Sequence, residues 1–247
     1  MRLRAPVTVV TVVGGTVTAV HLGALLVGAE ILGDLTQVLL MVFIALWLWL
    51  RTTPDRDTSG GHGRRPRLVE LALVALVFSW LGDSVPRLLD GDAAFLTMVG
   101  FFLAAQVVYV AAFWPTRRRS AAVRARWSLP VYAAALVAIV AACAGEAGVL
   151  LPAVVVYASM LATMSILAWG VGPVAGVGGV IFLISDAMIA LGAFAPTFAP
   201  PQKDFLVMVT YVAAQVLIAC AVDRHVRGDA DGRDAARTAT SGDVGRG

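Results

Sequence analysis

The sequence predicts an all-α protein, a polytopic bundle of membrane-spanning helices. Of its 247 residues, 59% are hydrophobic and only 14% are charged, and the mean hydropathy is +0.84. A soluble domain has about 25% charged residues. The apolar residues also form long runs that short polar segments separate. These runs reach the length of about 20 residues that a membrane span needs.

The apolar runs divide the chain into eight candidate spans. Their expected ranges are 6–28, 34–51, 68–89, 93–114, 127–145, 149–169, 171–192 and 204–223. If the boundary of the fifth or sixth span is misplaced, the count becomes seven. The first span has a basic start, but no convincing cleavage site follows it, so we expect it to remain as an anchor.

The basic residues indicate the orientation of the spans. They cluster before the first span, between the second and third, between the fourth and fifth, and after the eighth. Only Arg87 and Lys203 lie elsewhere. The positive-inside rule then places both termini and the loops 52–66 and 115–126 in the cytoplasm, and the expected location is the plasma membrane. Seven spans would put the Arg-rich C-terminal segment outside, so the charges favour eight.

The chain is therefore expected to form one transmembrane domain, 1–227, followed by a disordered cytoplasmic tail, 228–247, which has almost no apolar residues. A short repeat lies within the domain: LGD and then FFLAAQVV in 81–108, and ISD and then TYVAAQVL in 184–217. In a chain this rich in Ala and Val, AAQV alone is a weak match. The shared order favours two parallel four-helix halves, related by an axis along the membrane normal.

Asp83 and Asp186 lie inside the third and seventh spans. A carboxylate in the bilayer costs roughly 2.5–3.5 kcal/mol on insertion scales, so such residues are functional-site candidates. Each aspartate lies 15 residues after the start of its apolar run, Leu68 or Val171. At 1.5 Å per residue, both are about 22 Å from the cytoplasmic side. The two carboxyl groups can therefore share one layer in the outer half of the membrane.

Two neighbouring carboxyl groups tend to share one proton, so that one acts as an acid and the other as a base. The alternative is structural, with each aspartate capping a broken helix or bonding to a Ser, Tyr or Trp. A metal site is disfavoured because no histidine is near either aspartate in the sequence, and no cofactor is indicated. The net charge of +3 is explained by the topology, so the charge gives no reason to expect nucleic acid as a partner.

Further polar residues at comparable depth predict a pocket inside the bundle. They are Gln106, Tyr109, Tyr157, Ser185, Tyr211 and Gln215. Each of them can instead bridge two helices by a hydrogen bond. Met164 is expected to line the pocket or to pack beside it. The glycine-rich segment 170–179 opens a span, where small residues usually permit close helix packing.

These residues together resemble the YhhN-type family of membrane proteins, which includes lysoplasmalogenase. The resembling segments, over about residues 70–222, are SWLGDSVPRLL, GFFLAAQVVYVAAF, the span with Tyr157 and Met164, IFLISDAMIAL and TYVAAQVLIA. The resemblance implies a hydrolase that cleaves the vinyl-ether bond of lysoplasmalogens to a fatty aldehyde and a glycerophospho-headgroup. It also implies that Asp83 and Asp186 are catalytic. Gln106 departs from the family, because histidine is expected there in many members.

The chemistry fits the residues. An enol ether is hydrolysed by proton transfer to carbon, after which water adds to the oxocarbenium ion and the hemiacetal collapses. A protonated aspartate supplies the acid, and an ionised one stabilises the cation and activates water. The expected partners are a lysophospholipid substrate and membrane lipids. Arg87 is expected either to meet the phosphate or to snorkel to the interface.

Two other function classes remain open from the sequence. A proton-coupled transporter also uses membrane carboxylates and repeated halves. A non-catalytic lipid-binding protein is the third option. The sequence leaves open the headgroup, the aspartate that acts as the acid, and the oligomeric state.

Overall fold

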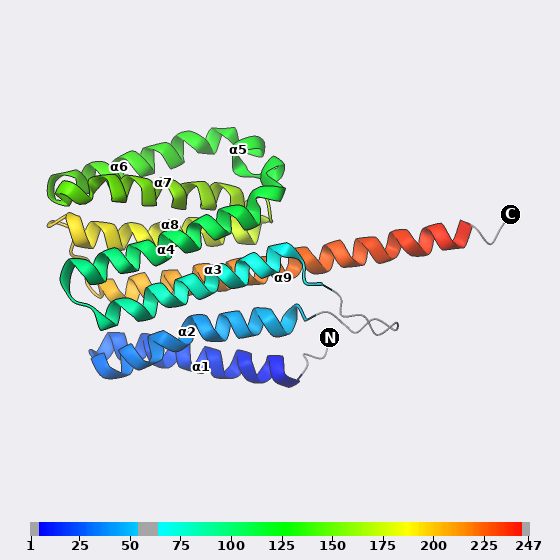
Figure 1. Cartoon of the computed structure of the whole chain (residues 1–247), viewed down its shortest axis with the longest axis horizontal. Helices are drawn as coiled ribbons and strands as arrows, with labels where there is room; N and C mark the ends of the chain where they lie inside the picture. The colour runs from blue at the N-terminus through cyan, green and yellow to red at the C-terminus, as the bar shows by residue number, and fades with distance from the viewer. Residues whose placement is uncertain (1–4, 54–63, 244–247) are drawn as a thin grey trace.

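The computed structural model describes residues 5–53 and 64–243, with side chains placed up to Asp229. All regular structure in these ranges is helical. The long helices are α1 (Ala5–Val27), α2 (Glu30–Arg51), α3 (Arg67–Ser84), α4 (Gly91–Phe113), α6 (Leu129–Ala147), α7 (Leu151–Ala168), α8 (Pro173–Phe194) and α9 (Lys203–Asp243). They lie side by side in one bundle (Figure 1).

Short helices connect some of the long ones. They are η1 (Val85–Leu88), η2 (Trp114–Arg119), α5 (Ala121–Arg124), η3 (Arg126–Ser128) and η4 (Gly148–Leu150). The loop predicted at 115–126 therefore has local helical structure. Most of the loop predicted at 52–66 lies outside the described residues. The side chains of the predicted tail beyond Asp229 also lie outside them, so its disorder stays a prediction.

Seven helical stretches in the described residues are long and apolar enough to cross a membrane. One of them, Arg126–Ala168, contains both α6 and α7. The chain turns between them at Gly148, whose φ of +47° lies in the left-handed region that glycine tolerates. As a result, α6 and α7 pack side by side (Figure 1). The protein is thus a polytopic helical bundle.

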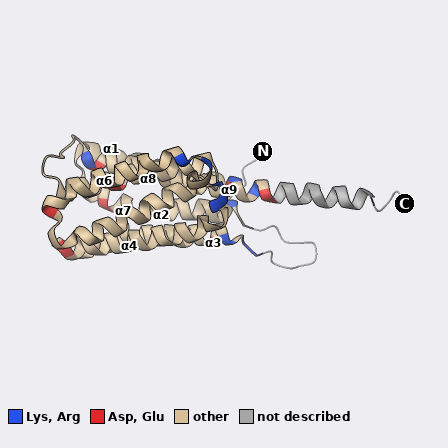
Figure 2. Ribbon diagram, turned by 90° about the horizontal axis from the view of Figure 1, so that it is seen from above, with Lys and Arg blue, Asp and Glu red and all other residues tan. Residues whose placement is uncertain are grey.

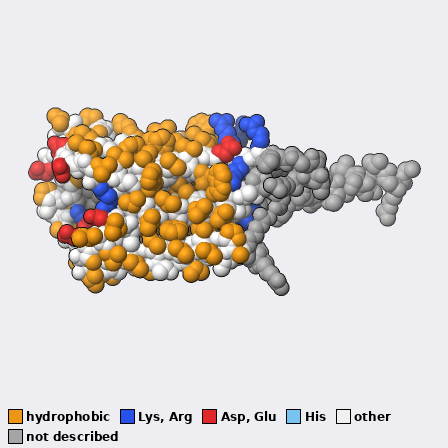
Figure 3. All heavy atoms as spheres, turned by 60° about the horizontal axis from the view of Figure 1, so that its bottom comes forward, with side chains coloured by type: hydrophobic (Ala, Val, Ile, Leu, Met, Phe, Trp, Pro, Cys, Tyr) orange, Lys and Arg blue, Asp and Glu red, His pale blue; other side chains and the backbone are white. Residues whose placement is uncertain are grey.

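The outer surface of the bundle is apolar along its length. Figure 3 shows hydrophobic side chains over the middle of one face, with charged side chains toward the ends. Exposed large apolar residues occur on most of the long helices, for example Val12, Leu35, Val77, Leu96, Val137, Val156, Val177 and Val216. A soluble monomer rarely exposes so much contiguous apolar surface, whereas lipid tails solvate it. Most arginines lie at one end of the bundle (Figure 2).

Glycines bring α8 close to both of its neighbours. A Cβ added at Gly179 would lie 2.8 Å from Cα of Ser165 on α7, and one at Gly178 would lie 3.1 Å from the backbone oxygen of Ala214 on α9. The predicted close packing of the glycine-rich segment is therefore confirmed. Because α8 lies between α7 and α9, the aspartate that it carries can contact side chains from other helices.

An ionic cluster joins the Arg-rich ends of α2 and α9. Asp223 is buried, and its Oδ2 accepts a hydrogen bond of 2.7 Å from Nη2 of Arg51. Its Oδ1 accepts one of 2.8 Å from Nε of Arg227. Arg227 also donates to the backbone oxygen of Arg51 at 2.9 Å. This cluster fixes the C-terminal helix against the N-terminal part of the bundle.

Candidate functional site

Two side-chain hydrogen bonds, about one helical turn apart, connect α3 to α9 at and next to Asp83. Tyr211 donates from its hydroxyl to Oδ2 of Asp83 at 3.0 Å. One turn away, Gln215 donates from Nε2 to Oγ of Ser79, also at 3.0 Å. Residues four positions apart lie on the same face of a helix. Ser79 and Asp83 therefore lie on one face of α3, and this face packs against Gln215 and Tyr211 on the antiparallel helix α9.

Two aromatic rings fix the Tyr211 side chain. Phe102 on α4 and Phe182 on α8 both pack edge-on against it, with ring centroids 5.6 Å apart in each case. Phe102 itself lies directly against Gly82, where an added Cβ would be 3.1 Å from its ring. The tyrosine hydroxyl is therefore directed at the carboxyl by packing as well as by the hydrogen bond.

Asp186 has a tyrosine partner of its own. Tyr157 on α7 donates a hydrogen bond to Oδ2 of Asp186 on α8. The neighbouring Ser185 donates instead to the backbone oxygen of Val207 on α9, at 2.9 Å. Adjacent residues on α8 thus bond to opposite neighbours, which fixes the rotation of the helix and the direction of Asp186. Both aspartates are more than nine-tenths buried.

Both carboxyl groups line the same cavity, which we call the polar cavity. It has a volume of about 540 Å³. Besides the aspartates, its polar lining residues are Glu30, Asp34, Gln37, Arg87, Asp204 and Tyr211. These residues come from α2, α3, η1, α8 and α9. The structure therefore brings Asp83 and Asp186 to a single space that polar groups surround.

A second space, the apolar cleft, begins at Asp186. Its lining comes from α4, α6, η4, α7 and α8 and includes Phe95, Leu136, Val154 and Phe194. Asp186, Met98, Phe102 and Ile189 line both the cleft and the polar cavity, whereas Asp83 lines only the polar cavity. Leu96 on the wall of the cleft is exposed, so the cleft reaches the outer surface of the bundle.

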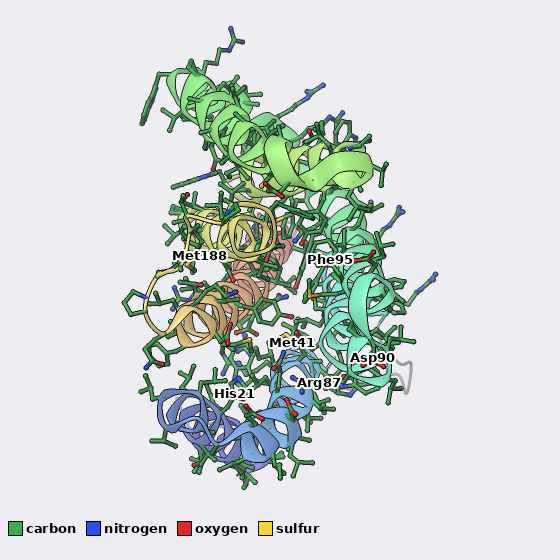
Figure 4. The ribbon with its side chains drawn as sticks, turned by 90° about the vertical axis from the view of Figure 1, so that its left-hand side faces the viewer. His21, Met41, Arg87, Asp90, Phe95 and Met188 are labelled. Atoms are coloured by element: carbon green, nitrogen blue, oxygen red, sulfur yellow. The ribbon has the colours of Figure 1, made fainter. Side chains whose placement is uncertain are left out.

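Arg87 lies at the mouth of the polar cavity. Its Nε donates to the backbone oxygen of Asp83 at 3.0 Å, and its terminal nitrogens bond to the side chains of Asp34 and Gln37 on α2. Pro86 interrupts the end of α3, and the arginine satisfies a carbonyl of that end. Figure 4 shows Arg87 beside α2 in a view from this end of the bundle. The side chain is thus engaged in the site and does not simply snorkel outward.

Gln106 is a polar residue whose hydrogen-bonding capacity is largely unused. It is completely buried on α4, where its amide lies near the Tyr157 hydroxyl, but neither amide atom makes a well-formed hydrogen bond in the described structure. Gln215 occupies the matching position of the second AAQV segment and is satisfied: its oxygen accepts from Tyr109 at 2.7 Å. The two copies of the short repeat therefore place glutamines in different environments.

The residues proposed from the sequence fall into three groups. Asp83, Asp186, Tyr157 and Tyr211 lie at the cavities. Gln106, Tyr109 and Gln215 form a buried polar layer behind them. Ser185 bridges α8 and α9, and Met164 is packed in the core, so neither lines the polar cavity or the apolar cleft. Their predicted role in substrate binding stays a prediction.

The sequence pattern did not indicate that α2 and Ser79 contribute to the site. Gln37 lies inside an apolar run of the sequence, and a polar residue in such a run is the signal that could have identified it as part of the site. Asp34 and Glu30 look like ordinary loop acids in the sequence, yet both line the polar cavity. Among the described residues, no group of three or more His, Cys, Asp or Glu side chains is arranged to hold a metal ion.

Together, the fold and the site define a class: a polytopic membrane bundle with two buried carboxyl groups at one cavity. The chain belongs to the YhhN family, whose model matches residues 32–222 and so includes both aspartates. It is similar to a protein from Sus scrofa named lysoplasmalogenase TMEM86B, with 30% identity over 189 residues, 73% of this chain and 72% of that protein. No solved structure matches the chain.

Proposed function

We propose that this protein is a membrane hydrolase that cleaves the vinyl-ether bond of lysoplasmalogens, with Asp83 and Asp186 as its catalytic pair. The observation that carries the proposal is that both carboxyl groups line one polar cavity, and that Asp186 also lines an apolar cleft. A lysoplasmalogen has a polar headgroup on one side of its vinyl ether and an alkenyl chain on the other. Membership of the YhhN family and the similarity to a lysoplasmalogenase support the same activity.

The two spaces fit the two ends of such a substrate. The headgroup and the attacking water occupy the polar cavity, where Arg87 faces the phosphate. The first part of the chain lies in the apolar cleft, which is narrow at about 60 Å³, and the remainder passes beyond Leu96 into the bilayer. The vinyl ether then lies between the two carboxyl groups, at the boundary that both spaces share.

This placement assigns a role to each aspartate. The alkene carbon that accepts the proton is on the chain side of the bond, and Asp186 is the carboxyl that borders the apolar cleft. Protonated Asp186 transfers its proton to that carbon, which leaves an oxocarbenium ion. Ionised Asp83, on the polar side, stabilises the cation and takes a proton from water as the water adds. The resulting hemiacetal collapses to the aldehyde and the free headgroup alcohol.

We further propose eight membrane crossings with both termini in the cytoplasm, in the plasma membrane. The separate helices α6 and α7 and the arginines at one end of the bundle support this topology. The parallel four-helix repeat belongs to the same proposal. Labelling single cysteines placed at positions 2 and 227 in intact cells tests it, because a membrane-impermeant reagent should reach neither of them.

The activity is tested with purified protein in nanodiscs. A 1-alkenyl lysophosphatidylethanolamine should release a fatty aldehyde, whereas the 1-alkyl and 1-acyl analogues should release none. Asp83→Asn and Asp186→Asn should each abolish release, while Asp90→Asn, an exposed acid that lines neither space, should leave it intact. Full turnover in both the Asp83→Asn and the Asp186→Asn variants would contradict the proposed mechanism. Solute uptake into vesicles without any aldehyde would favour a transporter.

The assignment of roles has its own test. In D₂O, the released aldehyde should carry one deuterium on the carbon next to its carbonyl, because that carbon receives the catalytic proton. Formate is small enough for the polar cavity and can replace a lost carboxylate there. It should therefore restore part of the turnover of Asp83→Ala, in which the truncated side chain leaves room for it beside the attacking water, and none of Asp186→Ala, in which the lost group is the acid that must protonate carbon. Rescue of the Asp186 variant but not of the Asp83 variant would instead make Asp83 the acid and Asp186 the base.

A further inference from the structure

A separate cavity, the basic pocket, lies at the other end of the bundle from Arg87. It has a volume of about 730 Å³ and is bounded by α5, α6 and the turn from α7 to α8. It shares no lining residue with the polar cavity. Arg119 and Arg124 line it, and no ion-pair partner is found for either in the described part of the chain.

The segment that forms most of the basic pocket carries only positive charges. Residues 114–145 contain five arginines and no acidic residue. Figure 2 shows basic residues gathered at this end of the bundle. An anionic ligand therefore meets a positive rim here, close to the level at which the helices leave the apolar layer.

A buried serine also lines the basic pocket. Ser120 is only 1% exposed, and its side chain makes no capping hydrogen bond to α5, which begins directly after it. Beside it, the Tyr132 hydroxyl is already engaged, because it lies 3.1 Å from Oγ of Ser165 and accepts from the Trp169 indole at 3.2 Å. Because the Ser120 side chain is not used to cap α5, its hydroxyl can donate to a ligand in the pocket.

The remaining lining of the basic pocket suits a lipid. Val131, Ala135, Val180 and Leu183 give it an apolar wall on α6 and α8. Trp127 at the same pocket is largely exposed, as is typical of tryptophans that lie at the headgroup level of a bilayer. A small soluble anion would bind to the arginines but would make no contact with this apolar wall.

We infer that the basic pocket binds an anionic phospholipid of the leaflet on the arginine-rich side. Arg119 and Arg124 bond to the phosphate oxygens, Ser120 donates its hydroxyl to the same group, and one chain lies along the α6–α8 wall. No reacting group of the vinyl-ether hydrolysis proposed above lines the basic pocket, and of its lining residues only Leu183 also lines the apolar cleft.

The test is native mass spectrometry of the detergent-purified full chain with dioleoyl phosphatidylglycerol, and with dioleoyl phosphatidylcholine as the zwitterionic comparison. Phosphatidylglycerol should bind preferentially. Arg119→Ala/Arg124→Ala should weaken its binding about 30-fold, given about 1 kcal/mol for each arginine near the surface. The matched double variant Arg117→Ala/Arg118→Ala removes the same charge from the same segment but no lining residue, and it should retain the preference.

Two further measurements keep the inference falsifiable if the arginine variant does not fold. Ala135→Trp fills the apolar wall without changing the charge, so it should also reduce phosphatidylglycerol binding. Glycerol 3-phosphate, which has the phosphate and no chains, should fail to displace the lipid at equal concentration. Equal losses in the two double-arginine variants, no preference over phosphatidylcholine, or displacement by glycerol 3-phosphate would each overturn the proposal.

Discussion

Tyr211 on α9 donates a 3.0 Å hydrogen bond to Oδ2 of Asp83 on α3, although 128 residues separate them in the chain. Tyr157 bonds in the same way to Asp186. Each of the two carboxyl groups thus keeps one oxygen bonded to a phenol, and both groups line the polar cavity. A carboxyl group oriented in this way has little reorganisation left to undergo during a reaction.

The two tyrosines should therefore matter for turnover more than for folding. Tyr211→Phe and Tyr157→Phe should each lower kcat by about 10- to 100-fold, because a hydrogen bond to a charged group contributes about 1.5–3 kcal/mol. Tyr211 bonds to the ionised Asp83, and Tyr157 bonds to the negative charge that develops on Asp186 as it gives up its proton. The measurement is aldehyde release under saturating substrate. Tyr132→Phe removes a hydroxyl that bonds only to Ser165 and Trp169, so it should stay within about twofold of the wild type. Equal losses in all three variants would argue for a general packing effect.

The two glutamines of the AAQV segments should respond oppositely to the same substitution. Gln106→Leu removes two buried polar atoms that make no well-formed hydrogen bond, so thermal stability should be unchanged or higher. Gln215→Leu leaves the Tyr109 and Ser79 hydroxyls without their partner and should cost about 1–3 kcal/mol. Thermal unfolding in detergent compares the two. A clear destabilisation by Gln106→Leu would instead indicate that a bound water or substrate group satisfies this amide.

Gly82 packs next to the aromatic side chains that position the proposed catalytic pair. In Gly82→Ala, the new methyl group would lie 3.1 Å from the Phe102 ring, and Phe102 packs on Tyr211. We expect Phe102 to shift and kcat to fall by up to about tenfold, because small displacements of positioned groups are costly to catalysis. Gly100→Ala on α4 is the control, since nothing lies within 4 Å of its new Cβ. It should keep full activity and gain about 1 kcal/mol of helix stability.

Arg87 should affect substrate binding rather than the chemical step. Arg87→Met should raise KM for the lysophospholipid about tenfold with kcat nearly unchanged, because a contact made equally in the bound and transition states is uniform binding. Lys203→Met removes the other basic residue near this end but not one that lines the polar cavity, so its KM should stay at the wild-type value. A fall in kcat without a change in KM would place Arg87 in the chemistry instead.

The Asp223 cluster should dominate stability at the opposite end. Asp223→Ala leaves Arg51, whose side chain is only 14% exposed, without its carboxylate, whereas Arg227 is 42% exposed and stays solvated. Breaking such a cluster costs about 3–5 kcal/mol. Asp92→Ala at the exposed start of α4 should change stability by less than about 1 kcal/mol. Chemical unfolding in mild detergent, followed by tryptophan fluorescence, measures both values.

The sequence by itself determined the helical membrane class and the two aspartates. Helix lengths follow from the apolar runs, since the bilayer requires about 20 residues for each crossing, and a carboxylate in such a run stands out by its cost. The relationship between α3 and α9 was not visible, because the match of Ser79 and Asp83 to Gln215 and Tyr211 depends on how each helix rotates in the bundle.

Only the tertiary structure decided which polar residues belong to the site. Ser185 and Asp186 are adjacent in the chain, yet one bonds to the α9 backbone and the other lines the polar cavity. Gln37 and Asp34 join the site because Arg87 bonds to both across the helix interface. The reason is physical: an apolar sequence specifies that a helix enters the membrane but not which face turns inward. That direction is set by contacts between helices, such as the close approach that Gly178 and Gly179 permit.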